Sequence, residues 1–273
     1  MESRYDVVVA GAGVAGLHAA YLLARNGFSV AIVEMKEEKD IGDKVCGDAI
    51  GEHHFKNVGL EEPRLGVDAT GVFEGVRVYS PSRKYYITAG GKGYALDRKA
   101  FGQRLLRMAI NAGADLYDAT AITKPVVEGS WVTGLIARDA RGVLEFRAKA
   151  VIEATGATAS IRTKLPSEWW ISYKASLEDF NAAYRIIGRV EEELDTRYAI
   201  IYLDISIAPG GYWWLFPKER HVANIGLGVK AGLPNANPKT NLKEKVLPQL
   251  SIKEVFHEGG GIVPTRRPLA CMV

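Results

Sequence analysis

The sequence DVVVAGAGVAG, residues 6–16, joins an apolar run to the glycine pattern G-x-G-x-x-G. Residues 6–10 predict a buried strand, residues 14–26 a helix that ends at Gly27, and residues 28–34 a second strand. In such a unit the first glycine allows a tight turn, the second lets the backbone approach a pyrophosphate, and the third lets the helix pack on the strand. The helix N-terminus offers free N–H groups to phosphates. The order of elements therefore predicts dinucleotide binding by Gly11, Gly13 and Gly16.

An acidic residue completes this pattern, because Glu34 closes the second predicted strand. Its carboxylate can accept hydrogen bonds from both ribose hydroxyls and disfavours a 2′-phosphate. A second glycine pattern, residues 226–231, also follows an apolar run but leads to Pro234 instead of a helix. We interpret it as glycines within a strand, so one nucleotide site is expected.

The elements that follow favour FAD over a nicotinamide cofactor. A nicotinamide dehydrogenase would continue to alternate strands and helices, whereas here a loop at 35–51 and a meander at 126–149 interrupt the parallel sheet. We predict an α/β (α+β) fold with an FAD-binding Rossmann-like βαβ domain and a mostly antiparallel sheet domain. The predicted divisions are 1–71 for the βαβ unit and its loop, 72–97 for the first strands of the substrate domain, 98–171 for the return to the FAD-binding domain, and 172–273 for the substrate domain.

Finer expectations accompany these divisions. We expect strands at 73–79, 84–88, 151–154, 182–190, 198–206, 212–216, 222–229 and 253–257, with helices at 98–111 and 241–250.

Composition excludes several classes of protein. Hydrophobic residues make up 47% and charged residues 25% of the chain, as in ordinary globular domains. The net charge of +3 is too small to attract nucleic acid, so we expect no nucleic-acid partner. Only Cys46 and Cys271 are cysteines, so we expect no disulfide framework and a cytoplasmic location. Without Cys-x-x-Cys or G-x-S-x-G, neither a metal site nor a serine hydrolase is indicated. The apolar run 7–24 imitates a membrane span, but its glycines argue against one.

Further motifs indicate a protein family. The chain resembles the geranylgeranyl reductases, flavoproteins of the para-hydroxybenzoate-hydroxylase-like group, over all 273 residues. The glycine motif and Glu153-Ala154-Thr155-Gly156 are shared by many flavoproteins, while the Cys-Gly-Asp and Tyr-x-Trp-x-Phe-Pro-Lys motifs are more specific. The motifs are residues 11–16 with Glu34, residues 43–49 (DKVCGDA), residues 153–156 (EATG), residues 211–218 (GYWWLFPK) with Asn224 and Gly226, and residues 264–268 (PTRRP).

The resemblance implies an FAD site and a reaction centre. Arg98 and Arg104 are reasonable phosphate or ribose partners because they lie near the start of one predicted helix, although solvated helix arginines remain the alternative. The catalytic candidates are Cys46, which is followed by glycine and aspartate, and Asp48; Cys46 would orient the alkene or the flavin, and Asp48 is expected to order the loop. The residues implied to bind FAD are Gly11, Gly13, Ala15, Gly16, Glu34, Val45, Cys46, Gly47, Ala49, Arg98, Arg104, Ala121, Thr155 and Gly156.

The family reaction is reduction of isolated C=C bonds in geranylgeranyl chains of isoprenoid diphosphates or membrane-lipid precursors, with hydride from N5 of reduced flavin. An external donor, NAD(P)H or ferredoxin, would supply the electrons. Alternation along the strand puts Tyr212, Trp214 and Phe216 on one face, which either lines an apolar substrate tunnel or is core. Lys218 either meets an anionic headgroup or is a solvated turn lysine. Residues 168–171 (EWWI) would contact a membrane surface.

Two alternatives stay open. An FAD-dependent monooxygenase would share the fold and the glycine motif, and oxygen consumption coupled to hydroxylation would identify it. The other is a catalytically impaired fragment. The sequence stops at Val273, before the Gly-Asp segment that the family places around the flavin ribityl chain, so we expect a C-terminally truncated enzyme that holds FAD loosely.

Overall fold

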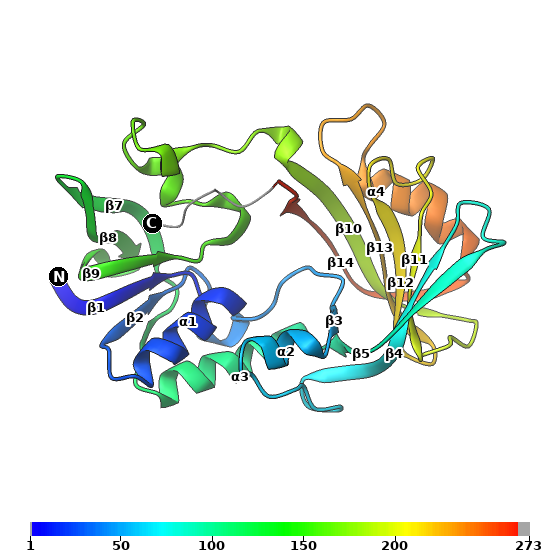
Figure 1. The fold of residues 1–273 in the computed structure, drawn as a ribbon, viewed down its shortest axis with the longest axis horizontal. Helices are drawn as coiled ribbons and strands as arrows, with labels where there is room; N and C mark the ends of the chain where they lie inside the picture. The colour runs from blue at the N-terminus through cyan, green and yellow to red at the C-terminus, as the bar shows by residue number, and fades with distance from the viewer. Residues whose placement is uncertain (1, 267–273) are drawn as a thin grey trace. The chain divides into compact units, whose positions relative to one another are not determined.

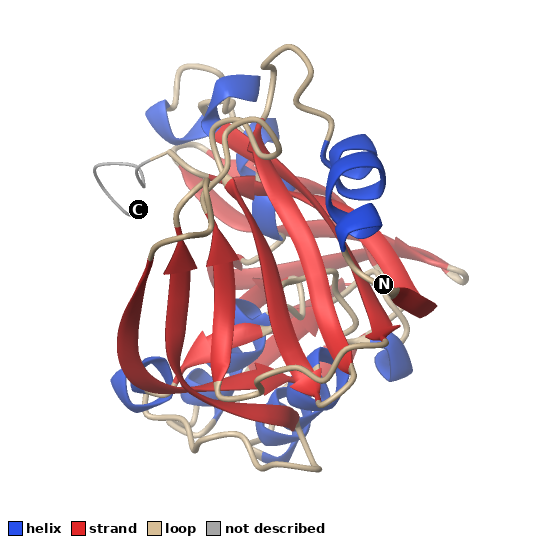
Figure 2. Ribbon diagram, turned by 90° about the vertical axis from the view of Figure 1, so that its right-hand side faces the viewer, coloured by secondary structure: helices blue, strands red, loops and turns tan. Residues whose placement is uncertain are grey.

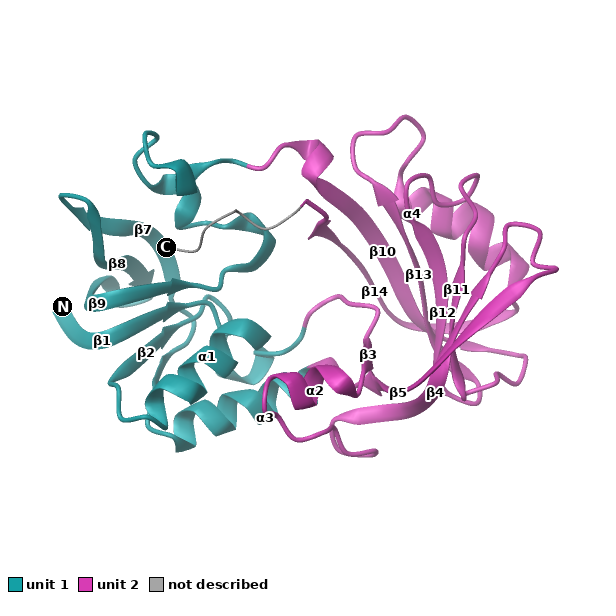
Figure 3. Cartoon of the chain, in the orientation of Figure 1, with its two compact units in different colours: residues 1–43, 99–174, 268–273 teal, residues 44–98, 175–267 magenta. Residues whose placement is uncertain are grey.

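The computed structural model describes residues 2–266, which form two compact units (Figure 3). Unit 1 contains residues 2–43 and 99–174, and unit 2 contains residues 44–98 and 175–266. Residues 44–71 belong to unit 2 because the first strand of this segment pairs with a later strand of that unit. Of the residues quoted above, Arg267, Pro268, Cys271 and Val273 lie outside the described part of the chain.

Unit 1 is built on a six-stranded sheet with the strand order β6-β2-β1-β9-β8-β7. The strands β1, β2, β6 and β9 are parallel where they pair, whereas β7, β8 and β9 form an antiparallel meander. The helix α1 packs along β1 and β2 (Figure 1). The elements are β1 (Glu2–Ala10), α1 (Val14–Ala24), β2 (Val30–Val33), η1 (Glu38–Asp40), α3 (Arg98–Asn111), β6 (Asp115–Tyr117), β7 (Ala121–Glu128), β8 (Trp131–Asp139), β9 (Gly142–Glu153), η2 (Gly156–Thr158), η3 (Arg162–Lys164) and η4 (Trp170–Ser172).

The centre of this sheet is apolar on both faces, as parallel strands require. All four residues of β2 are buried, as are the last four of β1. The strand–helix–strand opening predicted from residues 6–34 is confirmed, and the glycine motif joins β1 to α1 at the carboxyl end of the strand, where α/β sheets bind ligands.

Unit 2 contains an eight-stranded sheet with the strand order β14-β10-β13-β12-β11-β4-β5-β3. Figure 2 shows its long strands running side by side. Every pair is antiparallel except β11 with β4, so the sheet is mixed and not purely antiparallel. The elements are β3 (Ala49–Gly51), α2 (His53–Asn57), β4 (Ala69–Tyr79), β5 (Tyr86–Leu96), η5 (Leu177–Asp179), β10 (Phe180–Val190), β11 (Tyr198–Tyr202), β12 (Tyr212–Glu219), β13 (Val222–Lys230), α4 (Pro238–Asn241), η6 (Leu242–Val246), η7 (Leu247–Gln249) and β14 (Ile252–Pro264).

The two faces of this sheet carry different clusters. On the helix face, Trp213 and Leu215 pack with residues of the α4–η7 segment such as Leu242. On the opposite face, Trp214 and Phe216 form a second cluster, and residues 45–48 lie against it. We call this second surface the loop face. Within residues 2–266, no helix has both the length and the apolar character needed to cross a membrane.

Candidate active site

The three glycines of the motif in unit 1 have different surroundings. Gly11 has a φ of +101°, and a Cβ there would lie 2.6 Å from the carbonyl oxygen of Ala154. A Cβ on Gly16 would lie 2.0 Å from the carbonyl oxygen of Gly11. At Gly13, which caps α1, a Cβ would meet no protein atom within 4 Å. Gly11 and Gly16 therefore serve the fold, while Gly13 leaves open space at the helix N-terminus, where a phosphate can approach the backbone.

Glu34 organises this loop through its side chain. Its Oε2 accepts a hydrogen bond from the N–H of Ala12 at 2.7 Å, and its Oε1 accepts one from the N–H of Lys36 at 2.9 Å. A carboxylate has further acceptor capacity on each oxygen, so Glu34 can also accept ribose hydroxyls. The open space at Gly13, the N–H groups of α1 and this carboxylate fit the adenosine diphosphate half of FAD.

A second carboxylate, which sequence reasoning missed, orders the neighbouring loop. Glu153 ends β9, and its Oε1 accepts hydrogen bonds from the Thr155 hydroxyl at 2.9 Å and the Ile161 N–H at 2.8 Å. Its Oε2 accepts one from the N–H of Arg162 at 2.9 Å. Gly156 has a φ of +80°, a conformation that favours glycine. Glu153 thus shapes the turn that lies against Gly11; its place within the EATG motif was the available signal.

The other residues implied to bind FAD are dispersed through both units. Ala15 is exposed on the first turn of α1, and Ala121 is exposed at the start of β7. Arg98, the first residue of α3, is half-buried, and its Nε has no hydrogen-bond partner within residues 2–266. Arg104 is half-buried on the same helix, with its guanidinium 5.1 Å from the centre of the Phe101 ring.

In unit 2, a buried polar network joins Asp48, Lys218, Asn224 and Trp214, which we call the Asp48 cluster. Asp48 and Lys218 are 5% and 9% exposed, and Oδ2 of Asp48 lies 3.3 Å from Nζ of Lys218. The same oxygen accepts a hydrogen bond from Nδ2 of Asn224 at 3.0 Å. Oδ1 of Asn224 accepts one from Nε1 of Trp214 at 2.9 Å, and Nζ of Lys218 donates to the carbonyl oxygen of Leu96 at 2.7 Å. Buried charges require such pairing.

The Asp48 cluster fixes the loop that carries Cys46. Nδ2 of Asn224 donates to the carbonyl oxygen of Cys46 at 2.8 Å, while the thiol itself is exposed. Asp48 has a φ of +66°, a left-handed conformation that costs about 1–2 kcal/mol for a non-glycine residue. A Cβ on Gly47 would lie 3.2 Å from the Phe216 ring, so the backbone is pressed against the loop face. The arrangement presents the thiol while anchoring the backbone beside it.

The aromatic strand β12 has the predicted alternation. Tyr212, Trp214 and Phe216 lie on the loop face, with ring centres 6.0 and 5.9 Å apart, whereas Trp213 lies in the core of the helix face. Only Tyr212 is substantially exposed, at 43%. Lys218 is neither on a turn nor solvated, because it belongs to β12 and to the Asp48 cluster.

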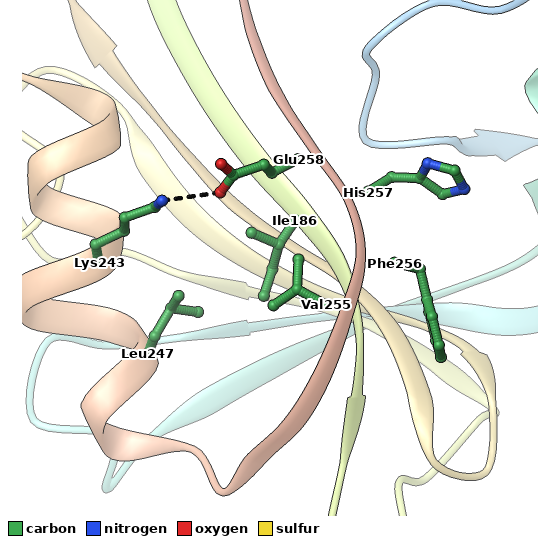
Figure 4. A pocket seen from close by; sticks show the side chains of 7 residues that line it. All are labelled: Ile186, Lys243, Leu247, Val255, Phe256, His257 and Glu258. Atoms are coloured by element: carbon green, nitrogen blue, oxygen red, sulfur yellow. Dashed lines mark ion pairs between the residues drawn. The ribbon is translucent and has the colours of Figure 1, made fainter.

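A separate pocket of about 490 Å³ opens on the helix face (Figure 4). Lys243 and Leu247 face Ile186 and Glu258 across it, and Nζ of Lys243 lies 2.9 Å from Oε2 of Glu258. This hydrogen-bonded ion pair lowers the pKa of Glu258 below its ordinary value. None of the predicted site residues lines the pocket.

Comparison with protein families matches both parts of the chain. Residues 6–162 match the family described as FAD dependent oxidoreductase, and residues 179–263 match the geranylgeranyl reductase catalytic domain. The first range contains the glycine loop, Glu34 and Glu153. The second contains β12, Lys218 and Asn224.

Curated relatives are similar along the length of the chain. It is 36% identical over 277 residues to digeranylgeranylglycerophospholipid reductase of Sulfolobus acidocaldarius, which spans 99% of this chain and 61% of the relative. It is 30% identical to the protein of that name from Methanoculleus marisnigri, which spans 100% of this chain and 68% of the relative. The chain thus spans less than two thirds of the length of the first relatives, at 61% and 64% for the Sulfolobus and Methanosarcina acetivorans proteins.

Solved structures agree with these matches. A geranylgeranyl bacteriochlorophyll reductase-like protein from Thermoplasma acidophilum superposes with a TM-score of 0.86 at 26% identity, over 97% of this chain and 67% of that one. A myxobacterial FAD-dependent halogenase superposes with a TM-score of 0.74 at 15% identity, over 96% of this chain and 64% of that one. The latter similarity shows the fold alone.

Proposed function

The chain belongs to the geranylgeranyl reductase family of FAD-dependent oxidoreductases, and from this membership we propose that it reduces isolated C=C bonds in geranylgeranyl chains. The substrate class is an isoprenoid diphosphate or a membrane-lipid precursor, in keeping with the digeranylgeranylglycerophospholipid reductases among its relatives. One observation carries the proposal: Lys218 and Asn224, which lie in the region that matches the catalytic domain, hold Asp48 and the backbone of Cys46 beside an aromatic strand.

Unit 1 would hold the cofactor. The open backbone at Gly13 and the N-terminus of α1 would receive the pyrophosphate, and Glu34 would receive the ribose. Arg98, Arg104, Ala121 and Thr155 are proposed as further contacts. Bound FAD would supply the hydride chemistry, for which no side chain is equipped.

Unit 2 would position the alkene. Tyr212, Trp214 and Phe216 give an apolar aromatic surface suited to a polyprenyl chain, and the exposed Cys46 thiol would orient the reacting bond. Asp48 would act as a positioning residue, because its carboxylate is buried in the ion pair with Lys218 and not directed to solvent. The same ion pair favours an internal role for Lys218 over contact with a headgroup.

An anaerobic turnover experiment tests the proposed function. The chain, loaded with FAD and reduced chemically, is mixed with geranylgeranyl diphosphate, and the products are analysed by mass spectrometry. We expect products that have gained two hydrogens for each reduced double bond. Unchanged substrate in this experiment, together with hydroxylation of an added aromatic compound when the reduced chain is exposed to oxygen, would support a monooxygenase instead.

We also propose that unit 2 contacts a membrane surface peripherally. Tyr85, in the turn between β4 and β5, is 74% exposed, Ile87 at the start of β5 is 70% exposed, and Ile205 in the loop after β11 is 79% exposed. Arg83 and Lys84 in the same turn add positive charge. Exposed aromatic and aliphatic side chains next to basic residues are typical of membrane interfaces.

The residues predicted for this role, 168–171, contribute one strongly exposed aromatic, Trp170 at 49%. Co-sedimentation with anionic lipid vesicles distinguishes the two surfaces. Ile205→Ser should reduce binding to the vesicles, whereas Trp131→Ser, which removes a similarly exposed hydrophobic side chain from unit 1, should not. Loss of binding in Trp170→Ser alone would assign the contact to residues 168–171.

A further inference from the structure

Arg185 is a buried cation without a partner. The residue lies in β10 and is 7% exposed. Its Nε and Nη1 are buried and make no hydrogen bond, and no carboxylate within residues 2–266 forms an ion pair with it. Arginine is almost never fully buried unless it is paired, because removing its charge from water is costly. The guanidinium therefore needs a hydrogen-bond acceptor that is not among residues 2–266.

The register of the sheet places Arg185 between two glycines on the loop face. On one side it pairs with Gly226 of β13, and on the other with Gly259 of β14, so neither neighbour carries a side chain. A Cβ on Gly226 would lie 2.6 Å from the Arg185 Cβ and 2.4 Å from Cζ2 of Trp214. The absence of a side chain at Gly226 thus allows Arg185 and the Trp214 indole, which we propose to bind substrate, to lie close together.

The loop that carries Cys46 crosses the same part of the loop face. Val45 packs over Gly259 in β14, since a Cβ there would lie 2.6 Å from its Cγ2. The carbonyl oxygen of Cys46 accepts its hydrogen bond from Asn224 in β13. Because β10 lies between β14 and β13, the loop spans the strand that carries Arg185. The cation and the proposed reaction centre therefore share one part of the loop face.

The charges of this region do not cancel. Asp48 and Lys218 are joined to each other as one negative and one positive group, and both are buried. Arg185 adds a second positive charge that no described carboxylate neutralises. The buried part of the loop face thus carries a net positive charge that a ligand with one or more negative oxygens would balance.

We propose that Arg185 binds an anionic phosphate oxygen of the ligand of unit 2, so that the isoprenoid substrate is selected by the charge of its phosphate or diphosphate group. This inference rests on the proposed function. The planar guanidinium can donate two parallel hydrogen bonds to phosphate oxygens, which makes arginine better suited to this group than lysine. Phosphate oxygens are also present in FAD, and the experiment separates the two sources.

The test compares two ligands with the same polyprenyl chain, geranylgeranyl diphosphate and the uncharged geranylgeraniol, by calorimetric titration into the FAD-loaded chain. The variants are Arg185→Met, Arg185→Lys and the matched control Arg189→Met. Arg189 lies four residues further along β10, but its side chain is 51% exposed and faces Glu254. FAD affinity is measured separately for each variant.

The wild-type chain should bind the diphosphate at least tenfold more tightly than the alcohol, which corresponds to one charge-assisted hydrogen bond or more. Arg185→Met should bind both ligands within about twofold of each other, Arg185→Lys should give an intermediate ratio, and Arg189→Met should match the wild type. FAD affinity should stay the same in all variants.

Two results would overturn the inference. One is a wild-type chain without preference for the diphosphate, a result that does not depend on any variant folding. The other is an unchanged preference in Arg185→Lys and Arg185→Met together with weakened FAD binding, which would assign the cation to the cofactor. Alkene reduction is scored separately: a chain that reduces the alkene without charge preference would refute only the role of Arg185, and one with the preference but no reduction would refute only the proposed function.

Discussion

Replacing Gly13 with alanine separates cofactor binding from folding. A Cβ at this position would meet no protein atom within 4 Å, and the backbone, with φ of −74° and ψ of 177°, is accessible to alanine. The protein should therefore accept the methyl group. A pyrophosphate at the N-terminus of α1 should not, because the methyl group would occupy the space through which it reaches the backbone.

The magnitudes differ between the two properties. Alanine is a poorer N-cap than glycine, which should cost at most about 1 kcal/mol, or about 2–4 °C in Tm for a domain of this size. Loss of one charge-assisted hydrogen bond to the pyrophosphate should weaken FAD binding by roughly 10- to 100-fold.

Gly16→Ala provides the matched contrast. Its Cβ would lie 2.0 Å from the carbonyl oxygen of Gly11, so α1 must move away from the sheet. Overpacking of this kind costs about 3 kcal/mol, or about 6–12 °C in Tm. Thermal denaturation of the apoprotein measures the fold, and titration with FAD at a temperature where both variants are folded measures the cofactor site. Wild-type FAD affinity in Gly13→Ala would refute the placement of the pyrophosphate at this helix.

Three further substitutions test the remaining parts of the site. Glu34→Ala should weaken FAD binding by about 1–3 kcal/mol, since ribose hydroxyls and a loop N–H lose their acceptor; the exposed Glu38→Ala is the control, and equal affinities in the two titrations would contradict the role of Glu34. Cys46→Ser should keep the Tm and most of the FAD affinity while changing the rate of reduction or the pattern of reduced products. Identical products at the wild-type rate would show that this residue has only a packing role. Lys218→Met should destabilise the chain by about 3–5 kcal/mol because buried Asp48 loses its ion-pair partner; adding Asp48→Asn should restore part of the Tm, and two independent, additive losses would argue against the ion pair.

Local patterns in the sequence predict unit 1 well. The helix at 98–111 is confirmed as α3, and the strand–helix–strand opening is confirmed, with a longer first strand and with a shorter helix and second strand than predicted. The strand predicted at 151–154 is instead the continuation of the last meander strand, so that β9 runs unbroken from Gly142 to Glu153. This strand pairs with β8 in its first half and with β1 through most of its length. The pairing of one strand with two partner strands cannot be predicted from the local periodicity of the sequence.

Three expectations for unit 2 differ from the structure. The strand expected at 198–206 ends at Tyr202, and the other two differences have physical reasons. The helix predicted at 241–250 is divided into α4, a π-helical turn and a 3-10 turn, because Pro248 cannot continue the α-helical hydrogen bonding. The strand expected at 253–257 is longer than predicted, because the glycines 259–261, which the prediction left outside it, lie inside β14. Pairing with β10 extends this strand, and a Cβ on Gly260 would lie 2.9 Å from the carbonyl oxygen of Ala183. The glycines therefore allow close approach.

The site was predicted as separate motifs, and its connections depend on tertiary structure. The pattern of β12 gave the correct faces for Trp214 and Phe216. The contact of Asn224 with Asp48, however, links residues far apart in the chain and depends on the register of β13. The role of Arg185 could not be predicted from the sequence. An arginine in a strand is common, and only the strand pairing shows that its neighbours on both sides are glycines.

The parallel pair of β4 and β11 affects how the protein can be made on the ribosome. β4 and β5 emerge early and can form a hairpin, but β11 follows only after the whole middle segment of unit 1 has been synthesised. Until then one edge of β4 has free N–H and C=O groups that can pair with another nascent chain. Newly made protein should therefore be most prone to aggregation when translation stops between residues 97 and 198, and a pause at that point is the condition under which a chaperone would matter most.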